Sequence, residues 1–194
     1  RRMWAGGSIE TLRPLRHGAL VIRTSTIADI QVKQGSNGSM FLVSIAHDIA
    51  DGDGTAIRER QDLVFSDPPA QTAAPVGPAR KIAAEWQVEA SPLLLFRFAA
   101  FTFNGHRIHY DHPYVTAVEG YPGLVVHGPL IALEMLNALQ TAQPALVLRS
   151  FDFTPKRPIT VPMTMHAHGK RDGDGWSLWM ETDGALASVG RVTA

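Results

Sequence analysis

Apolar and polar residues alternate through much of the first 67 residues, which is the pattern of strands that bury one face. Residues 19–33 are rich in β-branched side chains, which favour strands. Glycines at both ends of the turn 35–38 predict a hairpin to the strand that follows. The strands of the predicted antiparallel meander are 9–13, 19–33, 40–50 and 55–65.

This first half contains no amphipathic helix to cover the apolar face of its strands. A sheet with one bare apolar face is not a finished domain. We therefore expect the face to be covered by the second half of the chain, by a partner, or by residues before Arg1. The sequence begins without a methionine, and we expect that a further segment precedes it.

Residues 68–91 contain four prolines and many alanines and show little periodicity, so they predict a linker. The second half, 92–194, begins with a predicted helix that Ser91 caps and Pro92 opens. A longer helix is predicted from about Gly128 to Leu139, with leucines along one face. The predicted strands of this half are 145–153, 159–169, 175–182 and 185–192.

The order of these elements fits one antiparallel sheet curled around one long helix. Both halves contain four predicted strands, so we interpret the chain as a duplicated unit whose first copy lacks its helix.

Composition excludes several classes of function. The chain has 194 residues, with 18 Lys+Arg balancing 18 Asp+Glu, which argues against a nucleic-acid partner held by phosphate contacts. It has no cysteine, so it forms no disulfide and has no thiolate nucleophile, and this is compatible with a cytoplasmic location. No apolar run reaches the roughly 18 residues of a membrane span, and we expect no membrane partner.

A histidine-rich segment, 103–111 (FNGHRIHYD), is the first candidate for chemistry. Histidine transfers protons near neutral pH, but a loop histidine can also simply bind a buried carbonyl. A zinc site is a further alternative, although the segment lacks a second pair of ligands and is predicted to be a loop. The residues with ligand-like side chains are His106, His109, Asp111 and His112.

A second candidate is the segment 119–130, where glycines flank an apolar strip that leads into the longer helix. The unpaired N–H groups of Gly128 and Leu130 could polarise a carbonyl, because Pro129 between them has no N–H. The alternative is an ordinary helix cap, with His127 bonded across the turn. Lys156 and Arg157 form a small cationic patch that could hold a phosphate or could be a solvated strand end.

These motifs carry a family resemblance. The segments 103–111 and 123–130 (GLVVHGPL) resemble the MaoC-like hydratase/dehydratases. More narrowly, they resemble the branch of type-2 3-hydroxyacyl-thioester dehydratases that includes mesaconyl-CoA and itaconyl-CoA hydratases, and residues 1–7 are similar to the middle of such proteins. The resemblance implies an α+β double hotdog, with a partial first hotdog at 1–67 and the active site in a second at 92–194.

The resemblance also implies a reaction, in which water adds to a 2-enoyl thioester or leaves a 3-hydroxyacyl thioester. His109 matches the catalytic histidine of the motif, whereas Asn104 stands where an aspartate is expected. An amide cannot act as a base at neutral pH, so we expect His109 to transfer the proton and Asn104 to position the water. The helix-start amides near Gly128 would hold the thioester carbonyl.

The implied substrate is a CoA or acyl-carrier thioester, and no metal or redox cofactor is expected. A short dicarboxylic acyl group would need a cation, for which Arg107 is the nearest candidate, and the phosphates of CoA would meet Lys156 or Arg157. The hotdog resemblance further suggests a homo-oligomer.

Two other functions stay open at this point. A hotdog thioesterase would need a carboxylate such as Glu119 or Glu134, and it would release free thiol. A non-catalytic acyl-thioester binding domain would account for the amide at Asn104.

Overall fold

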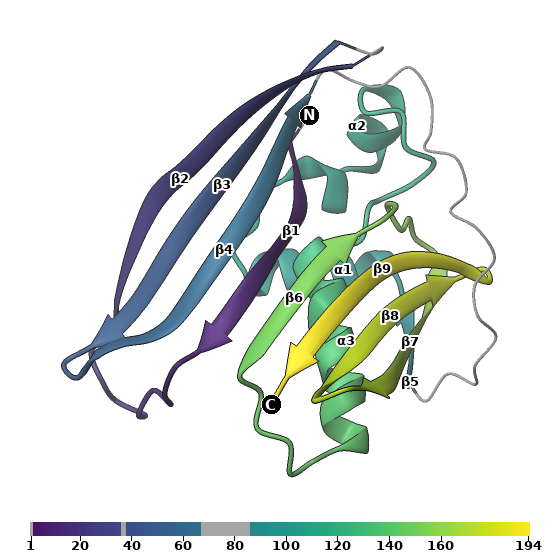
Figure 1. Ribbon diagram of the computed structural model, residues 1–194. Coiled ribbons are helices and arrows are strands. Elements are labelled where there is room, and N and C mark those ends of the chain that lie inside the picture. Colours follow the sequence, from purple (N-terminus) through teal and green to yellow (C-terminus); the bar gives the residue numbers. More distant parts are fainter. Residues whose placement is uncertain (1, 36–37, 67–85) are drawn as a thin grey trace.

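The structure is a computed structural model that describes residues 2–35, 38–66 and 86–194. Over these residues the chain forms a nine-stranded antiparallel sheet, and helices lie against one part of it (Figure 1). The elements are β1 (Arg2–Thr11), β2 (Ile22–Gly35), β3 (Gly38–Asp51), β4 (Gly54–Ser66), β5 (Trp86–Ala90), α1 (Pro92–Phe101), the 3₁₀ turn η1 (Arg107–His109), α2 (His112–Ala117), α3 (Gly128–Ala142), β6 (Ser150–Pro155), β7 (Met163–Asp172), β8 (Gly175–Thr182) and β9 (Ala185–Thr193).

The first half forms strands in the order β2-β3-β4-β1. The hairpins β2–β3 and β3–β4 confirm the prediction, but the first strand pairs with β4 and not with β2. The chain after β1 turns toward the β3–β4 turn, where the Leu12 N–H bonds to the Ala56 carbonyl at 2.8 Å and Arg13 forms an ion pair with Asp51. These contacts hold the end of β1 beside β4. The predicted strand order of a simple meander, in which β1 would pair with β2, is therefore wrong.

The second half repeats this arrangement, with the order β6-β9-β8-β7-β5. The strand β6 pairs with β9 rather than with the next strand, β7. It begins at Ser150, later than predicted, and β7 begins only after Pro162, whose nitrogen has no hydrogen to donate to a ladder. The predicted strand 175–182 is confirmed in full.

The strand β5 corrects the predicted linker. Trp86–Ala90 pairs with β7 at the edge of the sheet, so the C-terminal end of the segment 68–91 is part of the fold. The remainder of that segment, residues 68–85, lies outside the described residues. The division into a first half at 1–67 and a second at 92–194 stays a prediction.

A single pair of strands joins the two halves into one sheet. The strands β1 and β6 run antiparallel, with Gly7 opposite Phe153 and Ile9 opposite Phe151. Gly7 is needed here because a Cβ at this position would lie 2.2 Å from the carbonyl oxygen of Arg60 on β4. The close approach of β1 to both neighbours brings the first residues of the chain beside the second half.

The long helix α3 fills the curve of the second half, and Figure 1 shows it behind β6 and β9. Its Leu130, Met135 and Leu139 are buried, and the helix packs against β7, β8 and β9. The predicted cap of α1 is confirmed, because Ser91 accepts a hydrogen bond from the Leu94 N–H. Asp111 caps α2 in the same way by accepting from the Tyr114 N–H. The predicted sheet around a central helix is therefore present in this half.

The first half has no such helix within the described residues. Its strands leave apolar side chains exposed, including Ile27, Ile30 and Val32 on β2 and Phe41 on β3. The second half does not cover these side chains, so the expectation that it does is wrong for this part of the face. None of the helices in the described ranges is long and apolar enough to cross a membrane.

Candidate active site

A cavity of about 550 Å³ lies where the two halves of the chain meet. Strands β1 and β4 contribute Trp4, Gln61 and Leu63 to its lining. The second half contributes the η1 segment, the start of α3 and the residues after β6. The cavity therefore needs both halves, whereas the sequence predicts an active site in the second half alone.

His109 is a buried member of the cavity lining, with 6% of its surface exposed. Its Nδ1 lies 2.7 Å from the carbonyl oxygen of Val125. A carbonyl oxygen only accepts, so Nδ1 carries the hydrogen and Nε2 keeps its lone pair. Burial lowers the pKa of His109 to about 4, so the ring is a neutral proton acceptor at neutral pH.

His127 lies beneath this ring. The two imidazoles are stacked with centroids 3.6 Å apart and an angle of 17° between their planes, and Phe98 contacts the His127 ring edge-on. His127 is fully buried, and neither of its ring nitrogens has a hydrogen-bond partner in the described part of the chain. Burial, and then the charge of His109, lower its pKa to about 3. The alternative of a side-chain bond across the turn therefore finds no support in the described residues, and the ring serves as an apolar support for His109.

His106 also lines the cavity and is half-buried. Its ring meets that of His109 edge-to-face, with centroids 5.5 Å apart and an angle of 89°. Burial, and then the positive charge of Arg2, lower the pKa of His106 below 6.5, while the charge of Glu119 opposes them. Two histidines thus face one cavity from a single short loop.

Asn104 has a different position from the one expected. Its side-chain oxygen accepts a hydrogen bond of 3.1 Å from the backbone N–H of His106, and the residue is not part of the cavity lining. The bond shapes the loop as an Asx turn. Direct positioning of a water in the cavity therefore lacks a geometric basis, and Asn104 instead fixes the backbone of His106.

The start of α3 borders the same cavity at Gly128. A Cβ at this position would lie 2.6 Å from the Trp4 ring, so only glycine fits the close contact between the helix and β1. Among the described residues, no backbone carbonyl accepts from the N–H of Gly128 or Leu130. The Leu130 side chain is buried in the core, so only its backbone could serve a ligand.

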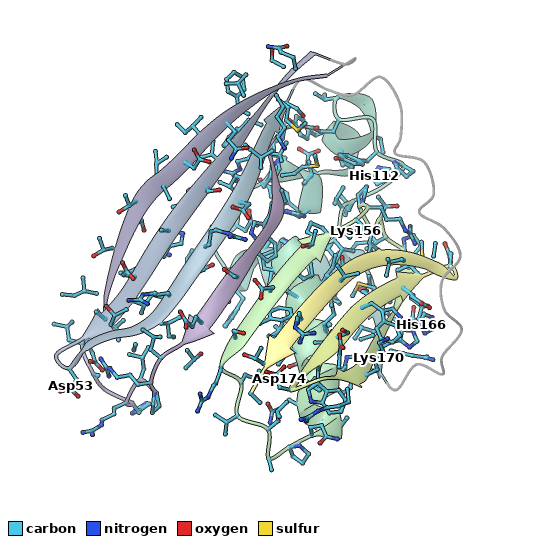
Figure 2. The ribbon with its side chains drawn as sticks, in the orientation of Figure 1. Asp53, His112, Lys156, His166, Lys170 and Asp174 are labelled. Carbon is cyan, nitrogen blue, oxygen red and sulfur yellow. The ribbon has the colours of Figure 1, made fainter. Side chains whose placement is uncertain are left out.

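The predicted cations differ in their freedom to bind a ligand. Lys156, exposed just after β6, and Arg157 both line the cavity (Figure 2). The Arg157 guanidinium already donates to the carbonyls of Thr182 at 2.6 Å and Leu186 at 3.1 Å, which ties it to the β8–β9 hairpin. The structure therefore leaves Lys156 as the freer of the two.

Arg107, the cation expected to meet a dicarboxylic acyl group, is outside the cavity lining. Its guanidinium forms an ion pair of 2.8 Å with Asp111 and lies over the Tyr114 ring. Arg2 lines the cavity instead, and no ion pair joins it to a carboxylate of the described chain. Local sequence patterns did not indicate Arg2, because β1 is remote from the histidine loop along the chain.

The residues of the alternative functions lie elsewhere. Glu119 accepts a hydrogen bond from the Tyr114 hydroxyl at 3.0 Å, and Glu134 accepts one from the Trp86 indole at 2.9 Å. Neither carboxylate lines the cavity. In the residues that the structure describes, no three His, Asp or Glu side chains are grouped as metal ligands would be, and His112 is exposed at the start of α2 (Figure 2).

Comparisons with known proteins test the family resemblance that the sequence predicts. The family model for hydroxyacyl-thioester dehydratase type 2 matches residues 1–161. The mesaconyl-C(4)-CoA hydratase of Chloroflexus aurantiacus is 38% identical over 193 residues, covering 96% of this chain and 68% of the relative. The predicted family resemblance is thereby confirmed.

Solved structures confirm the predicted fold class. The crystal structure of HtdX from Mycobacterium tuberculosis matches 100% of this chain and 76% of its own, with a TM-score of 0.79 at 16% identity. Rv0216 from the same organism, described as having a double hotdog fold, matches 97% of this chain and 73% of its own, with a TM-score of 0.63 at 12% identity. The α+β double hotdog is therefore the fold of this chain.

Proposed function

Because the chain belongs to the hydroxyacyl-thioester dehydratase type 2 family, we propose that it reversibly hydrates a 2-enoyl thioester to a 3-hydroxyacyl thioester. The observation that carries the proposal is the hydrogen bond that fixes which ring nitrogen of His109 carries the hydrogen. Its Nδ1–H is committed to the Val125 carbonyl, so the cavity-lining ring keeps a lone pair on Nε2. A neutral imidazole of this kind is suited to take a proton from water.

The chemical step uses His109, a water molecule and the backbone N–H of Gly128. His109 Nε2 accepts a proton from water, and the water oxygen bonds to C3 as the double-bond electrons move toward the thioester carbonyl. The resulting enolate oxygen accepts a hydrogen bond from the Gly128 N–H at the start of α3. One donor of this kind typically contributes about 3 kcal/mol of transition-state stabilisation.

For the acyl group, we propose a short dicarboxylic chain such as mesaconyl or itaconyl. The similarity to a mesaconyl-C(4)-CoA hydratase supports this substrate. Arg2 offers a cation inside the cavity for the free carboxylate and takes the role that the sequence suggests for Arg107. At the other end of the substrate, Lys156 is suited to a phosphate of CoA, and Arg157 contributes charge while bound to the hairpin.

The reaction is tested by offering the purified chain mesaconyl-CoA, itaconyl-CoA and crotonyl-CoA and following each by mass. We expect a gain of one water without release of free CoA. Free CoA without hydration would support a thioesterase instead, and binding without any reaction would support a non-catalytic domain. A cytoplasmic location and self-association stay predictions of the sequence.

A further inference from the structure

Addition of water across a double bond needs a base for the water and an acid for the second carbon. His109 provides the base under the proposed function. The motif position that would supply a carboxylate holds Asn104, whose side-chain oxygen is already bonded to the His106 N–H and is not in the cavity lining. A second proton-transfer group must therefore come from another residue that faces the cavity.

His106 meets this requirement by its position. It lines the cavity, and its ring stands at 89° to that of His109 with the centroids 5.5 Å apart. Its backbone is held on both sides, because its N–H donates to Asn104 and its carbonyl accepts from the His109 N–H at 3.2 Å. Being half-buried, the ring also has access to solvent for proton exchange.

We propose that His106 is the second catalytic residue of this site and delivers the proton to C2 of the enoyl thioester. The inference rests on the proposed hydratase function and adds a residue that the hydratase motif does not assign. In the hydration direction, His109 Nε2 takes one proton of water and C3 receives the hydroxide. The protonated His106 gives its proton to C2, and the enolate electrons return to form the new C–H bond.

The atoms and charges of these steps balance. The substrate gains one oxygen and two hydrogens, and the site ends with a proton on His109 instead of His106. Burial lowers the pKa of His109 to about 4, so its imidazolium gives up the proton at neutral pH. The half-buried His106 regains a proton directly or through solvent. In dehydration the same groups exchange roles.

The protonation of His106 depends on the charged groups around it. Arg2 from β1 and a protonated His109 disfavour the imidazolium, whereas Glu119 favours it. Because the acid form is needed for hydration, the hydration rate should fall as the pH rises above the pKa of His106 in the complex. This alkaline limb is the signature of the proposal.

The test measures kcat for hydration of crotonyl-CoA against pH in the wild type, His106→Gln and His112→Gln. His112 is a matched control, because it is an exposed histidine of the same region outside the cavity lining. We expect His106→Gln to lower kcat by about 10²- to 10⁴-fold and to abolish the alkaline limb, while His112→Gln resembles the wild type. A His106→Gln variant that keeps the wild-type rate or the alkaline limb would overturn the proposal.

A second variant, His106→Asp, guards against a folding defect and places an acid of lower pKa at the same position. We expect it to be more active than His106→Gln, with the alkaline limb moved to lower pH. A His106→Asp variant that is folded but no better than His106→Gln would contradict the acid role. If the wild type hydrates no enoyl-CoA, the proposed function itself fails, which is distinct from an active wild type with an unaffected His106→Gln.

Discussion

The imidazole of His127 lies flat beneath that of His109, with their centroids 3.6 Å apart, and makes no hydrogen bond within the described residues. His127 directly precedes α3, so the helix that borders the cavity also fixes the ring against which His109 rests. The Val125 carbonyl holds the same His109 ring by its Nδ1. Two contacts from one short segment thus set the orientation of the proposed base.

Replacement of His127 by phenylalanine should leave the fold intact. The aromatic ring would keep the stack under His109, and two buried polar atoms without partners would be removed. We expect the free energy of unfolding of His127→Phe to equal that of the wild type or to exceed it by up to about 1 kcal/mol. His127→Ala, which leaves a cavity, should lose about 2–4 kcal/mol. Urea unfolding at pH 7 measures both, and a large loss in His127→Phe would show that the ring nitrogens have partners.

The same pair predicts a loss of stability in acid. Burial lowers the pKa of His109 to about 4 and that of His127 to about 3, while the unfolded chain takes up these protons near pH 6.5. Between pH 6.5 and 4 the unfolded state therefore binds more protons, and the free energy of unfolding falls as the pH falls. Each histidine contributes a slope of up to about 1.4 kcal/mol per pH unit.

Unfolding of the wild type and His127→Phe at several pH values measures this slope. The variant should retain only the contribution of His109 from this pair. Equal slopes in the two proteins would show that His127 is not held neutral in the folded state.

Asn104→Asp should change activity little. An aspartate can accept the same hydrogen bond from the His106 N–H, and the side chain is not in the cavity lining. We expect kcat/KM within about threefold of the wild type. An increase of tenfold or more, measured on the same enoyl-CoA, would mean that Asn104 has weakened the native site and that a carboxylate there can reach the substrate.

Arg2 should discriminate between acyl groups. Arg2→Met removes the cation that we assign to the free carboxylate, so kcat/KM for mesaconyl-CoA should fall about 10- to 100-fold, with little change for crotonyl-CoA. Arg107→Met is the matched control, because its guanidinium is paired with Asp111 outside the cavity lining. Equal losses on both substrates in Arg2→Met would assign Arg2 to the fold or to the CoA portion.

Local patterns in the sequence predicted the elements well where short-range chemistry determines them. Ser91 caps α1 as predicted, and the predicted strand 175–182 matches β8. The order of the strands was not predicted, because pairing of β1 with β4 and β6 depends on contacts between residues far apart in the sequence.

The site was likewise predicted from the sequence only in part. The motif identified His109, but the direction of each side chain in the loop depends on the fold. Asn104 is bonded away from the cavity while His106 lines it, although both belong to the same motif. Arg2 and Trp4 reach the cavity only through the pairing of β1, which no local pattern reveals.

Hydration by the wild type and by His109→Gln, with His112→Gln as the control, tests the central claim most directly. Each protein is given mesaconyl-CoA and crotonyl-CoA, the hydrated product is measured by mass, and folding is compared by thermal unfolding. The account predicts hydration by the wild type and His112→Gln, and a loss of about 10²- to 10⁴-fold in a folded His109→Gln. Hydration by His109→Gln within about threefold of the wild type would contradict the assignment of His109 as the base.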